Sequence, residues 1–94
     1  MIDLPSKFKI ANHEIIVNIV EHAADEDFGN FDSATNTITV AKFIDKVKLT
    51  DEQVLNTFYH ELIHCFQFYF DNSSSEAQAQ CYANFIREFL STKE

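Results

Sequence analysis

Hydrophobic residues recur at every third or fourth position over residues 54–69, the spacing that places side chains on one face of an α-helix. Just before them, Thr50 and Gln53 have the spacing of a capping box, in which each side chain bonds the other residue's backbone N–H. The pattern predicts a helix that begins at Asp51 and ends at about Phe70. The residues on its apolar face are Val54, Leu55, Phe58, Leu62, Cys65, Phe66 and Tyr69.

A second helical pattern follows a short polar segment. Asn72 and the serines after it are typical of one helix end followed by another helix start. We expect this second helix to span residues 76–90 and to pack on the first as a helical hairpin, with the small Ala79 and Ala83 allowing close approach. Its expected apolar face consists of Ala79, Tyr82, Ala83, Ile86, Phe89 and Leu90.

The first half of the chain shows strand patterns instead. Residues 8–10 and 15–20 are rich in β-branched and apolar residues, and they flank a turn-like segment at 11–14, so we expect a hairpin. The run at 15–20 is almost continuously apolar. This predicts a central strand that is covered on both faces or bent by a bulge.

Turn-forming residues at 33–36 predict a second hairpin. Residues 37–40 alternate polar and apolar, and we expect them to form an edge strand to which an extended peptide could add. Residues 43–49 are expected to form a connection or a short helix. The 94 residues therefore predict one α+β domain over residues 1–94, with a small N-terminal antiparallel sheet of about three strands followed by two helices.

The charge and the apolar runs restrict the partners of the protein. A net charge of -8 disfavours nucleic acid and anionic membranes, which repel an acidic surface. No run approaches the roughly 18 apolar residues of a transmembrane helix, and the first five residues lack the features of a signal peptide. We therefore expect a cytoplasmic protein without a nucleic-acid or membrane partner. Asp25-Glu26-Asp27 is interpreted as a solvated turn rather than a calcium site.

The first expected helix contains the motif His60-Glu61-Leu62-Ile63-His64. Side chains four residues apart project from one face of a helix, so the two imidazoles can share one metal ion. Glu61 lies about 100° around the helix, where it can reach a water on the metal but is badly placed to bind the metal with both histidines. Zinc lowers the pKa of a bound water towards about 7. The motif therefore predicts a zinc site in which Glu61 is the general base of amide hydrolysis.

A catalytic zinc generally takes three protein ligands. Glu76 is the favoured third ligand because it opens the second helix, where a short turn would bring the chain back beside His64. The less favoured alternatives are Asp71, Glu88, His13 and His22.

The second helix also carries a family resemblance. Its start, Glu76-Ala77-Gln78-Ala79-Gln80-Cys81-Tyr82-Ala83, resembles the E-x-x-A-[N/D/Q]-x-[F/Y]-A helix that follows H-E-x-x-H in gluzincin-type peptidases, particularly the ImmA/IrrE family and short phage-type metallopeptidase-like proteins. The segment leading into the motif from Gln53 and the stretch 29–40 are similar to those proteins too. The resemblance covers about two thirds of the chain. It implies a three-stranded sheet, zinc held by His60, His64 and Glu76, and Glu61 as general base and acid.

Two functions follow from these residues. The first is a zinc-dependent peptidase that acts on a peptide or protein substrate. The alternative is a zinc-binding regulatory or interaction module with little or no turnover, because the chain lacks the C-terminal domain of larger family members. Candidates for stabilising the oxyanion are Tyr82, Tyr59 and His13. Cys65 and Cys81 are interpreted as reduced, buried thiols, and a disulfide or a thiolate on the metal stays open.

Overall fold

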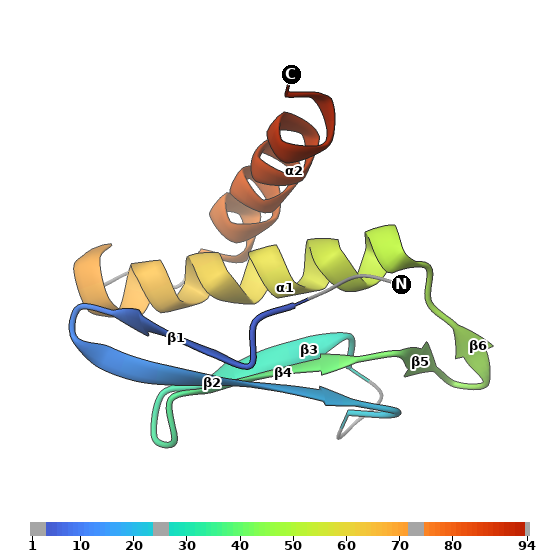
Figure 1. The fold of residues 1–94 in the computed structure, drawn as a ribbon, viewed down its shortest axis with the longest axis horizontal. Helices are drawn as coiled ribbons and strands as arrows, with labels where there is room; N and C mark the ends of the chain where they lie inside the picture. Colours follow the sequence, from blue (N-terminus) through green and yellow to red (C-terminus); the bar gives the residue numbers. More distant parts are fainter. Residues whose placement is uncertain (1–3, 24–26, 72–74, 94) are drawn as a thin grey trace.

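The structure is a computed structural model that describes residues 4–23, 27–71 and 75–93. Two expected turns, the one at Asp25 and Glu26 and the one at 72–74, lie outside these residues. The elements follow in the order β1 (Lys7–Ile10), β2 (His13–Val20), β3 (Gly29–Asp32), β4 (Thr37–Ala41), β5 (Phe43–Ile44), β6 (Val47–Lys48), α1 (Asp51–Phe66), η2 (Gln67–Asp71) and α2 (Glu76–Thr92) (Figure 1).

The expected α+β fold is confirmed, but the main sheet has four strands in the order β1-β2-β4-β3. Both expected hairpins are present, since β1 pairs with β2 and β3 pairs with β4 in antiparallel fashion. The central pair, β2 and β4, is parallel. The sheet is therefore mixed rather than antiparallel. The second strand of the β3–β4 hairpin, β4, lies beside β2 and runs parallel to it, and β3 forms the edge.

This strand order corrects the expected position of residues 37–40. They belong to β4, which is a central strand, and β3 is the edge strand on that side of the sheet. The alternation itself is confirmed, because Ile38 and Val40 are fully buried while Thr37 and Thr39 are partly exposed. An alternating pattern shows that one face is exposed, but it does not show which strands lie beside it.

The strand β2 is central, as expected, but only one of its faces is covered. Ile15 and Val17 point into the core, whereas Ile16, whose side chain lies on the opposite face of the strand, is 36% exposed. Its pairing with β4 is continuous from Ile16 to Val20, so no bulge interrupts that ladder. The helices lie on one face of the sheet only (Figure 1), which explains why the expected cover on both faces is wrong.

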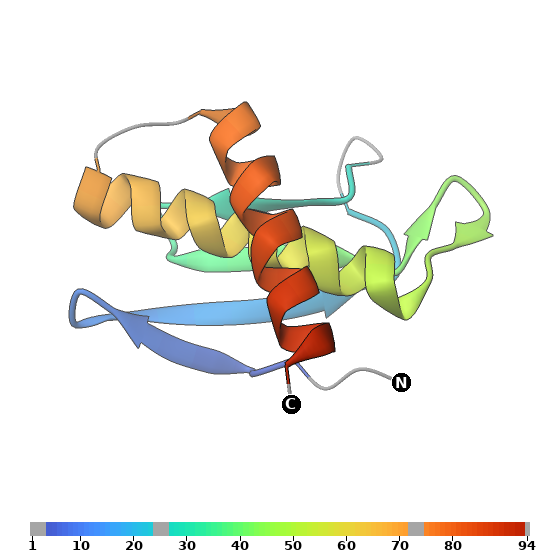
Figure 2. The same cartoon turned by 90° about the horizontal axis from the view of Figure 1, so that it is seen from above.

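The helix starts agree with the sequence. The Thr50 hydroxyl accepts the backbone N–H of Gln53 at 3.1 Å, and the Gln53 side chain accepts the N–H of Thr50 at 2.8 Å, which completes the capping box. Ser75 caps α2 in a similar way through the N–H of Gln78. The first helical segment continues to Asp71, but its last turn, η2, is a π-helix. Figure 2 shows α2 folding back obliquely across α1.

The segment 43–49 is neither a plain connection nor a helix. It contains the hairpin β5–β6, whose turn includes Asp45 with a φ of 55°. Aspartate tolerates this left-handed conformation better than most residues do, because its short polar side chain bonds locally. The expectation of a connection or a short helix is therefore wrong, because Asp45 and Lys46 form the turn of a hairpin.

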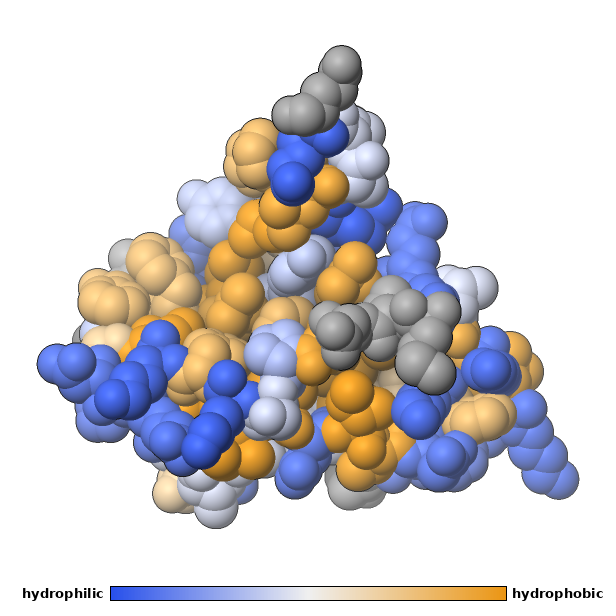
Figure 3. All heavy atoms as spheres, viewed as in Figure 1, coloured by the Kyte–Doolittle hydropathy of each residue, from blue (hydrophilic) through white to orange (hydrophobic). Residues whose placement is uncertain are grey.

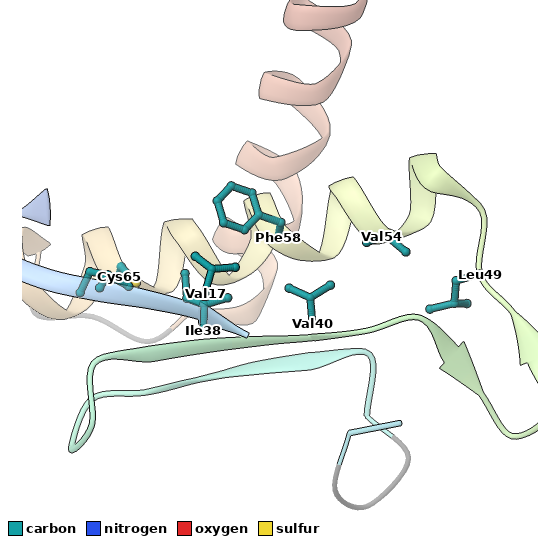
Figure 4. Close-up of a cluster of buried hydrophobic side chains, with 8 residues drawn as sticks. Val17, Ile38, Val40, Leu49, Val54, Phe58 and Cys65 are labelled. Atoms are coloured by element: carbon teal, nitrogen blue, oxygen red, sulfur yellow. The ribbon is translucent and has the colours of Figure 1, made fainter. Parts of the chain in front are cut away.

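The core lies between the sheet and α1 (Figure 4). Strands β2 and β4 supply one side, and α1 supplies the other through Val54, Phe58 and Cys65. From α2, only the two expected small residues, Ala79 and Ala83, are fully buried. Hydrophobic side chains consequently remain exposed along α2 (Figure 3); they are Tyr82, Phe85, Phe89 and Leu90.

Candidate metal centre

The two histidines of the motif face each other on the surface of α1. Their ring centroids are 4.8 Å apart, and the Nε2 atoms of His60 and His64 are separated by 3.2 Å. Both side chains are partly buried, with 18% of each exposed. The i, i+4 spacing thus brings two imidazole nitrogens to one point, as expected from helix geometry.

The first residue of α2 completes this cluster. Both carboxylate oxygens of Glu76 lie 3.0 Å from the Nε2 atom of His64 and 3.4 Å from that of His60. Partial burial raises the pKa of Glu76, but hydrogen bonding to His64 and His60 outweighs it and the net pKa is lowered. Among the described residues, these three side chains form the one group whose ligand atoms could hold a metal ion.

The alternative ligands lie elsewhere, as far as their side chains are described. His13 stacks on Tyr69 with ring centroids 4.5 Å apart, and His22 lies beside Phe43. Glu88 is not part of the cluster. The side chain of Asp71 lies outside the described part of the chain.

The donor set fits zinc. Ligand atoms at about 2.0–2.1 Å around a tetrahedral zinc are roughly 3.3 Å from one another, and the separations here are 3.0–3.4 Å. Two imidazole nitrogens and one carboxylate are also the kinds of ligand that catalytic zinc sites use. The spacing of these three side chains is therefore compatible with a tetrahedral zinc ion.

Glu61 occupies a sheltered position beside this cluster. The residue is only 7% exposed, and it lines a cleft next to the histidine and glutamate side chains. Burial raises the pKa of the Glu61 carboxyl, while the His64 and His60 imidazoles oppose this shift and the carboxylates of Glu76 and Asp27 add to it. A carboxylate with a raised pKa is a better proton acceptor, which is the property that a general base requires.

A cleft of about 550 Å³ opens beside the cluster. His60 and Glu61 on α1, Glu76 at the start of α2 and Gly29 at the start of β3 all line it. The three sequence-based candidates for an oxyanion group do not line this cleft, since none of Tyr59, Tyr82 and His13 contributes to it. Among the described residues on its walls, Asn84 and Arg87 of α2 can donate hydrogen bonds there, and Arg87 is already paired with Glu52 at 3.1 Å.

The sequence interpretation missed two glutamines. The Nδ1 atom of His64 lies 2.8 Å from the Oε1 atom of Gln67, and that of His60 lies 3.0 Å from the Oε1 atom of Gln80. Helical spacing offered a signal, because Gln67 follows His64 by three residues and Gln80 follows Glu76 by four. Each glutamine therefore stands one helical turn from a candidate ligand.

The cysteines do not belong to the centre. Both are free thiols, with Cys65 fully buried in the core and Cys81 exposed on α2. Burial and the nearby Glu61 raise the pKa of the Cys65 thiol to about 12. The interpretation as free thiols agrees with the structure, but the expected burial is right for Cys65 only and wrong for Cys81, because Ala79 and Ala83 are the residues of α2 that are buried.

Comparison of the chain with protein-family models, with curated proteins and with solved structures gives no match. The resemblance to the ImmA/IrrE peptidases therefore stays a prediction that depends on the residues quoted for it. In the described part of the chain, none of the helices is both long and apolar enough to cross a membrane.

Proposed function

We propose that this protein is a zinc-dependent peptidase of the gluzincin type. The observation that supports the proposal is the convergence of His60 Nε2, His64 Nε2 and the Glu76 carboxylate within 3.0–3.4 Å. The buried Glu61 follows one of these ligands directly and faces the same cleft. This arrangement supplies a metal site and a proton acceptor at one place.

In peptide hydrolysis, the three candidate ligands would bind the metal and Glu61 would transfer the proton. A bound zinc polarises a carbonyl group and lowers the pKa of a water molecule beside it. Glu61 accepts the proton of the attacking water and returns it to the leaving amine. His60, His64 and Glu76 fix the ion, and the partly dry surroundings of Glu61 strengthen these interactions.

The strand next to the cleft offers a place for the substrate. Gly29 lines the cleft, and the strand it opens, β3, is the sheet edge on that side. Figure 2 shows that α2 begins beyond this edge. An extended peptide that adds to β3 by backbone hydrogen bonds would pass the candidate centre. The substrate strand expected at 37–40 is thus replaced by β3.

A second candidate function is a zinc-containing interaction or regulatory module with little turnover. The observation that favours it is the absence of Tyr59, Tyr82 and His13 from the cleft, which leaves the oxyanion without any of its expected partners. Loss of one oxyanion donor costs an enzyme roughly 10²–10³ in kcat. For either function we propose a cytoplasmic location, where thiols such as Cys65 and Cys81 stay reduced.

The two functions are separated by a peptide library incubated with the zinc-loaded protein and with its Glu61→Gln variant. Zinc content is measured in both samples, because the variant must carry the ion to serve as a control. Cleavage by the native protein and none by the variant supports the peptidase. Cleavage by neither supports the interaction module. Cleavage by both would reject Glu61 as the general base, and absence of zinc from both would reject both functions.

A further inference from the structure

Gln67 is a polar side chain buried completely inside the protein, at the first residue of the π-helix η2. Its amide makes three hydrogen bonds. The Oε1 atom lies 2.8 Å from His64 Nδ1, and the Nε2 atom lies 3.1 Å from the backbone carbonyl of Ser75 and 2.6 Å from Oε1 of Gln78. Both amide protons and the amide oxygen of Gln67 therefore have partners.

The carbonyl of Ser75 fixes which end of the amide faces His64. A backbone carbonyl accepts hydrogen bonds and never donates them, so the NH₂ group of Gln67 must point towards Ser75. The amide oxygen consequently points towards His64, and a hydrogen bond forms there only if the Nδ1 atom carries the proton. In the neutral imidazole, the lone pair then lies on Nε2, which faces Glu76 at 3.0 Å.

We propose that Gln67 is a positioning residue that holds two of the three candidate metal ligands at once. Through its oxygen, it selects the Nδ1–H form of His64 and turns the Nε2 lone pair towards the site. Through its NH₂ group, it donates a hydrogen bond to the backbone carbonyl of Ser75, the N-cap residue of α2, and so fixes the position of the adjacent Glu76. The buried Gln67 amide thus connects the end of α1 that carries His64 to α2, the helix that supplies the Glu76 carboxylate. This inference rests on the proposed zinc centre.

The helix geometry around Gln67 agrees with this role. An α-helix places residues three apart side by side, which brings Gln67 next to His64. The helix changes to a π-helix at Gln67. Single π-helical turns occur frequently at functional sites.

A second glutamine provides an internal comparison. Gln80 accepts from His60 Nδ1 at 3.0 Å, and its NH₂ group donates to Asn84 at 3.1 Å. Asn84 is itself an amide that could turn over, so nothing fixes the orientation of Gln80 as Ser75 fixes that of Gln67. Gln80 is also exposed. The requirement for an Nδ1–H form is therefore stronger at His64 than at His60.

The test measures the tautomer of His64 in the metal-free protein by long-range ¹H–¹⁵N NMR, at a pH where the imidazole is neutral. We expect Nδ1–H in the native protein. Gln67→Met should lose this preference, while Gln67→Glu should keep it because a carboxylate also accepts from Nδ1. Gln78→Met is the matched control: it removes one partner of the Gln67 amide but not the bond to His64, so the tautomer should not change.

Zinc affinity, measured by competition with a chelator, gives the second readout. Loss of a group that orients a ligand typically lowers affinity 10–100-fold, so we expect this fall for Gln67→Met. Gln67→Glu keeps the acceptor for His64 but loses the donor to Ser75, so its affinity should lie between those of the native protein and Gln67→Met. An Nε2–H form of His64 in the native protein would overturn the inference even if no variant folded. An unchanged tautomer in Gln67→Met would do the same. If the native protein showed Nδ1–H but bound no zinc, the zinc centre would be wrong and the orientation of His64 by Gln67 would stand.

Discussion

The Nε2 atom of His64 lies 3.0 Å from both carboxylate oxygens of Glu76, although the two residues are on different helices. Because Gln67 accepts from Nδ1, this Nε2 atom presents a lone pair in the neutral imidazole. A lone pair and a carboxylate repel at this distance unless a cation or a proton lies between them. The contact therefore calls for either a bound metal ion or a protonated histidine, and crystals grown with zinc distinguish the two.

Removal of a candidate ligand should weaken zinc binding. We expect His60→Ala and His64→Ala to lower zinc affinity by at least about 100-fold, more than the loss of a residue that only orients a ligand. Glu76→Gln should also weaken binding, whereas Glu61→Gln should retain it. Chelator competition measures each constant, and His13→Ala serves as a histidine control outside the cluster. Equal affinity in native protein and Glu76→Gln would mean that another residue is the third ligand.

The buried Glu61 should lower the stability of the metal-free protein at neutral pH. Its pKa is raised in the folded state, mainly by burial. The native state therefore binds this proton more tightly than the unfolded state, and stability falls as the pH rises above the ordinary range of a glutamate. We expect metal-free Glu61→Gln to melt above the native protein at pH 7–8, with the difference shrinking below about pH 4.

Thermal unfolding across this pH range measures the effect of Glu61, and Glu88→Gln is the control at an exposed position. For a domain of this size, each 1 kcal/mol corresponds to roughly 4–8 °C. If Glu61→Gln melted below the native protein at every pH, Glu61 would stabilise the fold rather than strain it.

The two thiols should differ sharply in reactivity. Cys81 is exposed, whereas Cys65 is fully buried and its thiol has a pKa of about 12. Because the thiolate is the reactive form, we expect an alkylating reagent at pH 8 to modify one thiol in the folded protein and two in denaturant. The folded Cys81→Ser variant keeps only the Cys65 thiol and should not react on the same timescale. Rapid modification of Cys65 in the folded protein would contradict the packing of α1 on the sheet.

The glycine at the start of β3 is required by close packing. A Cβ atom on Gly29 would lie 2.4 Å from the backbone oxygen of Thr39 and 2.8 Å from Cγ2 of Thr57. Gly29→Ala should therefore push β3 away from β4 and α1, at a cost of about 1–3 kcal/mol. Its neighbour Asn30 is exposed on the same strand, so Asn30→Ala should change stability by less than about 0.5 kcal/mol. Equal melting temperatures of the two variants would contradict this packing.

The helices and the candidate ligands could be predicted from the sequence because their signals are local. The capping box at Thr50, the start of α2 at Glu76 and the i, i+4 histidines each depend on residues within one or two turns. The helices are separated by four residues only, 72–75, and so short a connection leaves Glu76 few places other than beside His64.

The sheet could be predicted less completely because strand pairing is not local. The alternation at 37–40 showed an exposed face, but the partners of β4 depend on where the β3–β4 hairpin inserts. The role of Gln67 was missed for a related reason. Its partners, His64 and Ser75, come together only after α2 has folded back over α1.

Diffraction data collected at the zinc absorption edge, from crystals grown with equimolar zinc, test the central claim most directly. The account predicts one anomalous peak bonded to Nε2 of His60, Nε2 of His64 and the Glu76 carboxylate, at about 2.0–2.2 Å from each. A crystal with no peak at this position, and with His64 and Glu76 still in contact, would contradict the metal centre and indicate an imidazolium–carboxylate pair instead.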